Sequence, residues 1–342
     1  MMDKKLKRAG FEERDFKNDE VTLGYVAGPN RSNGPPLVFI HGQGVTWEEY
    51  TFIMPLLSDD FTIFAVTQRG HGKSSFTPGQ YTFNALGKDM TSFLREVVRE
   101  PAIIIGNSSG GVLACWLAAN AKEHVKAIVL EDPPLFRCDY PNVANTAVYA
   151  VWQAFARSAE PDGGGFAAFF RDFLVPTMAA TANTEGRIMS STNPPPRFAL
   201  NMVSRLITLQ QKRHPGKPVD FSFLPAERRI MFRGMSQFDG NFSRAFVDGS
   251  MGQDFDHADT LGRIEVPVLF LHARYFLMKD GRLMGALTDE DAERVKGLVK
   301  GPWKYVKMDC GHAIAIDAPG EEAREIRSWV DEQGLNGADK NG

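Results

Sequence analysis

The chain has 342 residues, a formal net charge of −3, 43% hydrophobic residues and 24% charged residues. These values are ordinary for a folded globular protein and exclude a disordered chain, which needs low hydrophobicity and high net charge. The near-neutral charge gives no electrostatic reason to expect nucleic acid as a partner. Three cysteines are too few for a disulfide framework and suit a reducing compartment, so we expect a cytoplasmic protein.

The sequence predicts no membrane-spanning segment. No apolar run approaches the roughly 18 residues that span a bilayer. The basic start of the chain lacks the apolar core of a signal peptide. At the other end, the Gly- and Asn-rich residues 336–342 are expected to form a flexible tail.

Short apolar runs alternate with longer amphipathic stretches, which is typical of a mostly parallel sheet with helices on both faces. The expected strands are 37–40, 61–66, 102–105, 125–130, 266–271 and 303–308. The expected helices are 84–99, 109–121, one that opens at Thr288, and 321–330. We therefore expect an α/β fold.

The alternation stops between residues 133 and 262. This stretch contains triple-glycine and triple-proline runs and aromatic helical segments, with no clear strand pattern. An insertion of this length is usually functional, and it follows the carboxyl end of a strand, where parallel sheets build their sites. We predict an α/β core formed by residues 1–132 and 263–335. Residues 133–262 are inserted after the expected strand 125–130 as a largely helical cap domain.

The sharpest motif is Gly106-Asn107-Ser108-Ser109-Gly110, between an expected strand and an apolar helix. This is the context that a G-x-S-x-G nucleophile elbow requires, because the tight turn leaves no room for Cβ atoms beside the serine. The alternative is a Gly/Ser loop that only closes a strand-helix unit. The motif makes Ser108 the candidate nucleophile.

A second glycine turn, His41-Gly42-Gln43-Gly44, follows the first expected strand. It brings the backbone back toward Ser108, so that Gly42 and Gln43 with Ser109 form a candidate oxyanion hole. A simple glycine turn is the alternative. His312 follows the last expected strand and is the candidate base that the serine needs. No metal-binding or dinucleotide-binding motif is present, and we expect neither a metal nor a cofactor.

Four motifs in this order give the chain a resemblance to the α/β-hydrolase superfamily over nearly its full length. They are HGQG at 41–44, QRGHGKSS at 68–75, GNSSGG at 106–111 and DCGHAI at 309–314. The resemblance implies an α/β-hydrolase fold and a serine hydrolase with a cap. Gln68 departs from the family, in which Asp usually precedes RGHG. Epoxide hydrolases and haloalkane dehalogenases of this superfamily carry Asp where Ser108 stands.

The acid that orients His312 stays open at this stage. Most members carry it after the seventh strand, where this sequence reads Leu-His-Ala-Arg with no acid. Glu131-Asp132 follows the expected strand 125–130, which is the sixth strand in the family's numbering, and Glu131 resembles the glutamate that zearalenone lactonases place there. We therefore expect Glu131 to be the acid, with Asp132 and Asp280 as alternatives.

The aromatic residues of the insertion favour a hydrophobic substrate. The candidate pocket residues are Phe136, Tyr140, Trp152, Phe155 and Phe173. We predict hydrolysis of a carboxylic ester or lactone of a hydrophobic small molecule through an acyl-enzyme. C–C bond hydrolysis or cofactor-free perhydrolysis with the same triad, or ligand binding without catalysis, are the alternatives. The aromatic insertion also suits a homodimer surface.

Overall fold

The computed structural model describes residues 2, 4–29, 33–174 and 197–336. Except for Asn336, the predicted tail lies outside the described residues, as does part of the predicted insertion.

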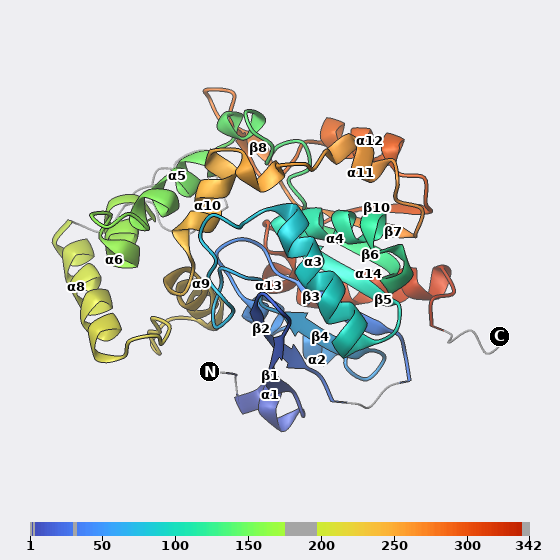
Figure 1. The fold of residues 1–342 in the computed structure, drawn as a ribbon, viewed down its shortest axis with the longest axis horizontal. Coiled ribbons are helices and arrows are strands. Elements are labelled where there is room, and N and C mark those ends of the chain that lie inside the picture. Colours follow the sequence, from blue (N-terminus) through green and yellow to red (C-terminus); the bar gives the residue numbers. More distant parts are fainter. Residues whose placement is uncertain (1, 3, 30–32, 175–196, 337–342) are drawn as a thin grey trace.

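Eight strands form one central sheet in the order β1-β2-β4-β3-β5-β6-β7-β10 (Figure 1). Their bounds are β1 Glu12–Lys17, β2 Thr22–Ala27, β3 Pro36–Ile40, β4 Thr62–Val66, β5 Ala102–Asn107, β6 Val125–Glu131, β7 Val268–His272 and β10 Trp303–Lys307. From β4 to β10 every neighbouring pair is parallel, while β2 runs antiparallel to both of its neighbours. The carboxyl ends of the six parallel strands therefore meet at one edge of the sheet.

The six predicted strands are confirmed, but two strands at the start of the chain were missed. In β1 only Phe16 is buried, so its sequence lacks the apolar alternation that marks a strand. A short hairpin of β8 (Phe276–Leu277) and β9 (Leu283–Met284) was missed as well. β1 and β8 lack a buried apolar face, whereas β2 is buried along most of its length.

The predicted core helices are confirmed, and they cover both faces of the sheet. They are α3 (Phe83–Phe93), which continues as η2 (Leu94–Val98), α4 (Ser109–Asn120), α12 (Asp289–Leu298) and α14 (Pro319–Glu332). Side chains of α3 and α4 belong to one hydrophobic cluster, and those of α14 belong to a second. The second cluster also holds η1 (Trp47–Tyr50) and α2 (Met54–Leu57). Thr288 caps α12 in a capping box with Asp291.

The described part of residues 133–262 is helical and contains none of the named strands. Its elements are η4 (Asn142–Asn145), α5 (Val148–Ser158), α6 (Gly165–Phe169), η5 (Phe170–Leu174), α8 (Arg197–Arg213), α9 (Ala226–Ser236), α10 (Gly240–Val247), η6 (Ser250–Gly252) and α11 (His257–Leu261). We call residues 133–262 the insertion. Figure 1 shows α5, α6 and α8 extending to one side of the sheet. The insertion also has a hydrophobic cluster of its own.

Replacing Gly110 in α4 by Ala tests the close contact between this helix and β3. A Cβ atom at Gly110 would lie 2.1 Å from the Ile40 carbonyl oxygen, which is backbone and cannot move aside cheaply. We expect the free energy of unfolding to fall by about 3 kcal/mol or more, measured by urea denaturation. Gly297→Ala in α12 is the control, because nothing lies near its Cβ and the helix should gain about 0.5–1 kcal/mol. Equal stability of the two variants would contradict the prediction.

Candidate active site

Ser108 lies in a strained turn between β5 and α4. Its backbone has φ 53° and ψ −122°, a conformation that residues with a side chain rarely adopt. A Cβ atom at Gly106 would lie 2.3 Å from the Gly110 carbonyl oxygen, so the turn needs glycine at both positions. Strain of this kind costs on the order of 1–3 kcal/mol and is concentrated at functional sites. The strand, turn and helix expected around Ser108 are therefore present.

The glycine loop after β3 lies directly against Ser108. A Cβ atom at Gly42 would lie 3.1 Å from the Ser108 Cβ. Within the described part of the chain, the backbone N–H groups of Gln43 and Ser109 have no hydrogen-bond acceptor. Two free donors beside a nucleophile suit an oxyanion.

Gly42 does not fit the predicted oxyanion hole as a donor. Its backbone N–H donates to Oε2 of Glu49 at 3.0 Å, so this N–H is already occupied. The sequence did not indicate this, because Glu49 reaches the loop only through the folding back of η1. Gly42 instead contributes the close approach of the loop to Ser108.

Two buried histidines hold the same loop in place. His41 Nε2 accepts the backbone N–H of Gln68 at 3.0 Å, and His71 Nε2 accepts the backbone N–H of Gly44 at 3.1 Å. The Gln68 side chain donates to the His41 carbonyl oxygen at 2.6 Å. Burial lowers the pKa of His41 to about 4, so this ring is neutral at neutral pH and accepts hydrogen bonds. Gln68, which departs from the family pattern, therefore supports the loop.

The side chain that contacts His312 is Asp132. His312 follows β10 and precedes α13 (Ile314–Asp317), and its Nδ1 lies 2.6 Å from Oδ2 of Asp132. Oδ1 of Asp132 accepts the backbone N–H of Ala273 at 3.3 Å. The Asp132 side chain is only 2% exposed, whereas that of His312 is 45% exposed. An ionised Asp132 requires a proton on Nδ1, which leaves Nε2 of His312 free to accept one.

The expectation that Glu131 contacts His312 was wrong. Glu131 is the last residue of β6 and follows Val129 on the face of the sheet that α14 covers. The next residue, Asp132, leaves the strand with φ 46°, and its side chain is directed toward His312. The exposed fraction of the whole residue does not distinguish Glu131 from Asp132, because it is at most 1% for both. Sequence alone did not indicate which of the two adjacent carboxylates faces the edge.

Asp280 is not part of the site. It lies between β8 and β9, where its carboxylate accepts a hydrogen bond from Nε of Arg282 at 2.8 Å. This pairing lowers the pKa of Asp280.

Opposing effects act on the pKa of His312. Partial burial of the ring lowers it, but the hydrogen bond and charge of Asp132 outweigh this effect. The net result is a pKa above the ordinary value of a histidine. A base of this kind loses its function when the pH falls through the raised pKa.

Sequence reasoning missed Asn107 and Tyr50. The Asn107 side chain donates to the His312 carbonyl oxygen at 2.9 Å, which connects the residue before Ser108 to the loop that carries His312. The Asn107 backbone N–H donates to the buried Tyr50 hydroxyl at 3.2 Å, and this hydroxyl donates to the Ile40 carbonyl oxygen. Asn107 occupies a variable position of the G-x-S-x-G motif and Tyr50 lies in no motif, so no sequence pattern indicated either role. The only available signal was that a buried tyrosine hydroxyl needs a partner.

The five predicted pocket residues mainly contact other aromatic side chains. Trp152 packs on Phe246, and Phe155 stacks on Phe169 with ring centroids 3.8 Å apart. Phe173 also contacts Phe169. Phe136 contacts His257 and lies under the Arg294 guanidinium, while Tyr140 is exposed. Of the five, Phe155 lines a described pocket, together with Phe76, Met235 and Phe238.

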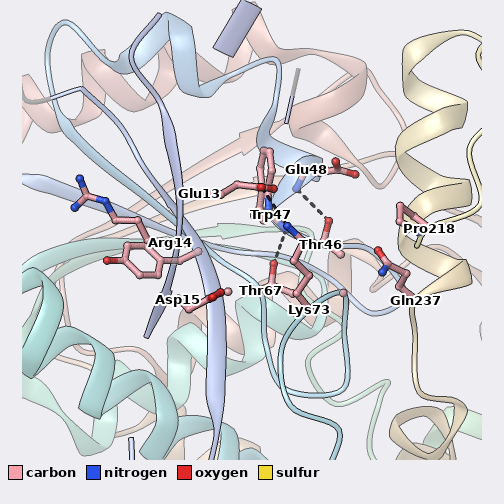
Figure 2. Close-up of a pocket in the computed structure, with 13 residues that line it drawn as sticks. Glu13, Arg14, Asp15, Thr46, Trp47, Glu48, Thr67, Lys73, Pro218 and Gln237 are labelled. Atoms are coloured by element: carbon pink, nitrogen blue, oxygen red, sulfur yellow. Dashed lines mark hydrogen bonds and ion pairs between the residues drawn. The ribbon is translucent and has the colours of Figure 1, made fainter. Parts of the chain in front are cut away.

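A separate pocket lies at the β1–β2 edge of the sheet. Figure 2 shows its lining, which includes Glu13, Trp47, Lys73 and Gln237. Lys73 and Glu13 form an ion pair at 3.2 Å. Ser108 does not line this pocket, so it is distinct from the candidate site.

No group of three or more His, Cys, Asp or Glu side chains in the described ranges is arranged to hold a metal ion. No helix in the described part of the chain is long and apolar enough to cross a membrane.

The fold and the serine turn define a class of hydrolases, those with the nucleophile on a sharp turn between a strand and a helix. The sequence model of the alpha/beta hydrolase fold matches residues 35–275, more than half of the chain. The chain belongs to the alpha/beta hydrolase family.

Relatives within the family act on different bonds. Bifunctional epoxide hydrolase 2 of Sus scrofa is 25% identical over 323 residues, which are 89% of this chain and 53% of that protein. The 2-(acetamidomethylene)succinate hydrolase of Mesorhizobium japonicum is 33% identical over 102 residues, which are 30% of this chain and 37% of that protein. The chain thus spans about half or less of the length of these curated relatives.

Solved structures share the fold at low identity. The enol-lactonase from Burkholderia xenovorans LB400 has a TM-score of 0.60 and 16% identity, covering 93% of this chain and 100% of that one. Cfl2 from Burkholderia cenocepacia has a TM-score of 0.58 and 21% identity, covering 94% and 96%. At these identities the likeness shows the fold alone.

Replacing Asp132 by Asn tests the contact with His312. Asn tolerates the left-handed backbone at this position but cannot stabilise the imidazolium. We expect kcat to fall by about 10⁴-fold in steady-state assays. Asp280→Asn is the control and should leave kcat unchanged. A larger loss in Glu131→Gln than in Asp132→Asn would restore Glu131 as the acid.

The raised pKa of His312 predicts the acid side of the pH profile. Since only neutral imidazole accepts the serine proton, kcat/KM should decline as the pH falls, starting above the ordinary pKa of about 6.5. In Asp132→Asn, burial acts without the compensating charge, so the decline should move to lower pH. NMR titration of the His312 ring in both proteins measures the shift directly. A shift to higher pH in the variant would contradict the assignment.

Proposed function

We propose that the chain is a serine hydrolase that cleaves a carboxylic ester or lactone of a hydrophobic small molecule. The observation that carries the proposal is Ser108 in its strained turn, next to the free N–H groups of Gln43 and Ser109. The neighbouring Asn107 side chain holds the loop of His312, whose ring contacts Asp132. A nucleophile, an oxyanion hole and an oriented base are the three parts that acyl transfer requires.

The proposed reaction has two stages. Ser108 Oγ attacks the carbonyl carbon while Nε2 of His312 takes the hydroxyl proton, and Asp132 stabilises the imidazolium that forms. The N–H groups of Gln43 and Ser109 hold the oxyanion. His312 then protonates the leaving alkoxide, and Ser108 keeps the acyl group. A water molecule, deprotonated by His312, attacks the acyl-enzyme. The bond between Ser108 Oγ and the acyl carbon then breaks, His312 returns the proton to Ser108 Oγ, and the carboxylic acid is released.

The type of nucleophile favours esters and lactones over epoxides and alkyl halides. A carboxylate nucleophile can displace carbon–oxygen or carbon–halogen bonds at saturated carbon, whereas a serine hydroxyl suits attack on a carbonyl. The relatives include an epoxide hydrolase and a fluoroacetate dehalogenase, but this chain has Ser108 at the turn.

We further propose that the insertion acts as a cap over the oxyanion loop. A Cβ atom at Gly234 in α9 would lie 2.7 Å from the Gly44 carbonyl oxygen, so this helix packs on the loop. The Gln43 side chain donates to the Ser243 hydroxyl on α10. The aromatic cluster that includes Phe155 and Phe169 lies in the same insertion and favours an apolar substrate.

Mass spectrometry on aryl esters, alkyl esters and macrocyclic lactones tests the proposal, with Ser108→Ala as the control. We expect hydrolysis that depends on Ser108, with the rate falling by about 10⁴-fold or more in the variant. A fluorophosphonate probe should label Ser108 and not the variant. Equal rates in both proteins, or turnover of an epoxide but of no ester or lactone, would overturn the proposal.

A further inference from the structure

Three carboxyl groups are buried together beneath the candidate site. They belong to Glu49 on η1, Glu131 at the end of β6 and Glu322 on α14, and each is at most 3% exposed. Among the described residues none of them forms an ion pair with Lys or Arg. Buried carboxyl groups without a cation are costly when ionised, so this arrangement favours neutral forms.

Glu49 differs from the other two because it touches the oxyanion loop. Its Oε2 accepts the backbone N–H of Gly42 at 3.0 Å, and Gly42 lies against Ser108. The same carboxyl interacts electrostatically with His312. Glu49 therefore reaches both the loop that donates to the oxyanion and the residue that moves the proton.

We propose that Glu49 is a positioning residue that holds the oxyanion loop through Gly42 as a neutral carboxyl group. The inference rests on the proposed function, because it concerns the oxyanion of that reaction. A neutral carboxyl keeps the loop in place with its carbonyl oxygen. An ionised one would place a negative charge near a developing oxyanion and oppose the transition state.

The surroundings of Glu49 support the neutral form at neutral pH. Burial raises its pKa to about 8, against a lowering by the Gly42 N–H, with Glu131 raising it and His312 lowering it. Glu322 and the Tyr50 hydroxyl also interact electrostatically with Glu49. Burial also raises the pKa of Glu322 to about 7, and burial and Glu322 raise that of Glu131. Glu131 in turn raises the pKa of Glu49 but lowers that of Glu322, so burial is the main cause of the raised pKa of Glu49.

This arrangement predicts an alkaline limit to catalysis. As the pH rises through about 8, Glu49 loses its proton and the rate should fall. The acid limit comes from His312 and the alkaline limit from Glu49, so the profile should be bell-shaped. Glu49 is neutral in the range where His312 titrates, so replacing it by Gln should leave the acid limit nearly unchanged.

The experiment compares wild type, Glu49→Gln and Glu49→Leu from pH 5 to 9.5, with the Ser108→Ala rate subtracted. Wild-type kcat should fall by about sixteenfold between pH 8 and 9.5, following a single ionisation with a pKa of about 8. Glu49→Gln keeps an acceptor for Gly42 but cannot ionise, so its kcat should change less than about twofold over this interval. Glu49→Leu loses the acceptor, and its kcat should fall about 10- to 100-fold at pH 7 with KM nearly unchanged.

Glu48→Gln is the matched control. Glu48 is the neighbouring buried carboxylate, but it accepts a hydrogen bond from Arg233 at 2.9 Å instead of from Gly42. This variant should keep the alkaline fall of wild type. An alkaline fall that persists in Glu49→Gln, or that disappears in Glu48→Gln, would overturn the inference.

NMR titration of His312 separates this inference from the proposed function. The ring signals of His312 in wild type should show a second inflection near pH 8, as the nearby Glu49 ionises, and Glu49→Gln should lack it, whether or not a substrate has been found. If no compound in the panel is turned over, the proposed function fails, while the titration still tests the coupling between Glu49 and His312. A wild-type curve without this inflection, or a Glu49→Gln curve that keeps it, would contradict that coupling.

Discussion

The contact of the α4 N-terminus with the end of β3 is the constraint on which the candidate site depends. Gly110 approaches the Ile40 carbonyl oxygen so closely that a single Cβ atom does not fit. This contact brings the turn that carries Ser108 against the glycine loop that begins after Ile40. The strain at Ser108 is tolerated because the packed strand and helix on either side leave the turn no alternative.

Hydrogen bonds between loops extend this constraint across the carboxyl edge of the sheet. Asn107 holds the His312 loop, Tyr50 connects the ends of β3 and β5, and Asp132 orients the imidazole. Each contact joins residues far apart in the chain but adjacent at the edge. As a result, His312 has a raised pKa and lies near the buried Glu49, whose pKa is raised as well. In the proposed pH profile His312 sets the acid limit and Glu49 sets the alkaline limit.

Motifs predicted the backbone of the site better than its electrostatics. Gly106-x-Ser108-x-Gly110 predicted the turn, because only glycine fits beside such a nucleophile. Glu131 was preferred over Asp132 because it resembles the glutamate of zearalenone lactonases. The nearly fully buried strand gave no side-chain alternation that could have decided between the two residues. Gly42 was expected to donate to the oxyanion, but its N–H belongs to Glu49. Both errors concern the direction in which a single group points, namely a carboxylate side chain at the end of β6 and the backbone N–H of Gly42.

Local patterns in the sequence are sufficient to predict the six parallel strands, the core helices, the serine turn and the loop that carries His312. These patterns are apolar runs, glycine spacing and helix caps, which act within a few residues of the chain. Which carboxylate faces His312, and which one supports the oxyanion loop, depends on tertiary contacts alone. Those choices depend on a positive φ at Asp132 and on the packing of η1 and α14 against one face of the sheet. Contacts between distant segments set burial and charge, and no local pattern records them.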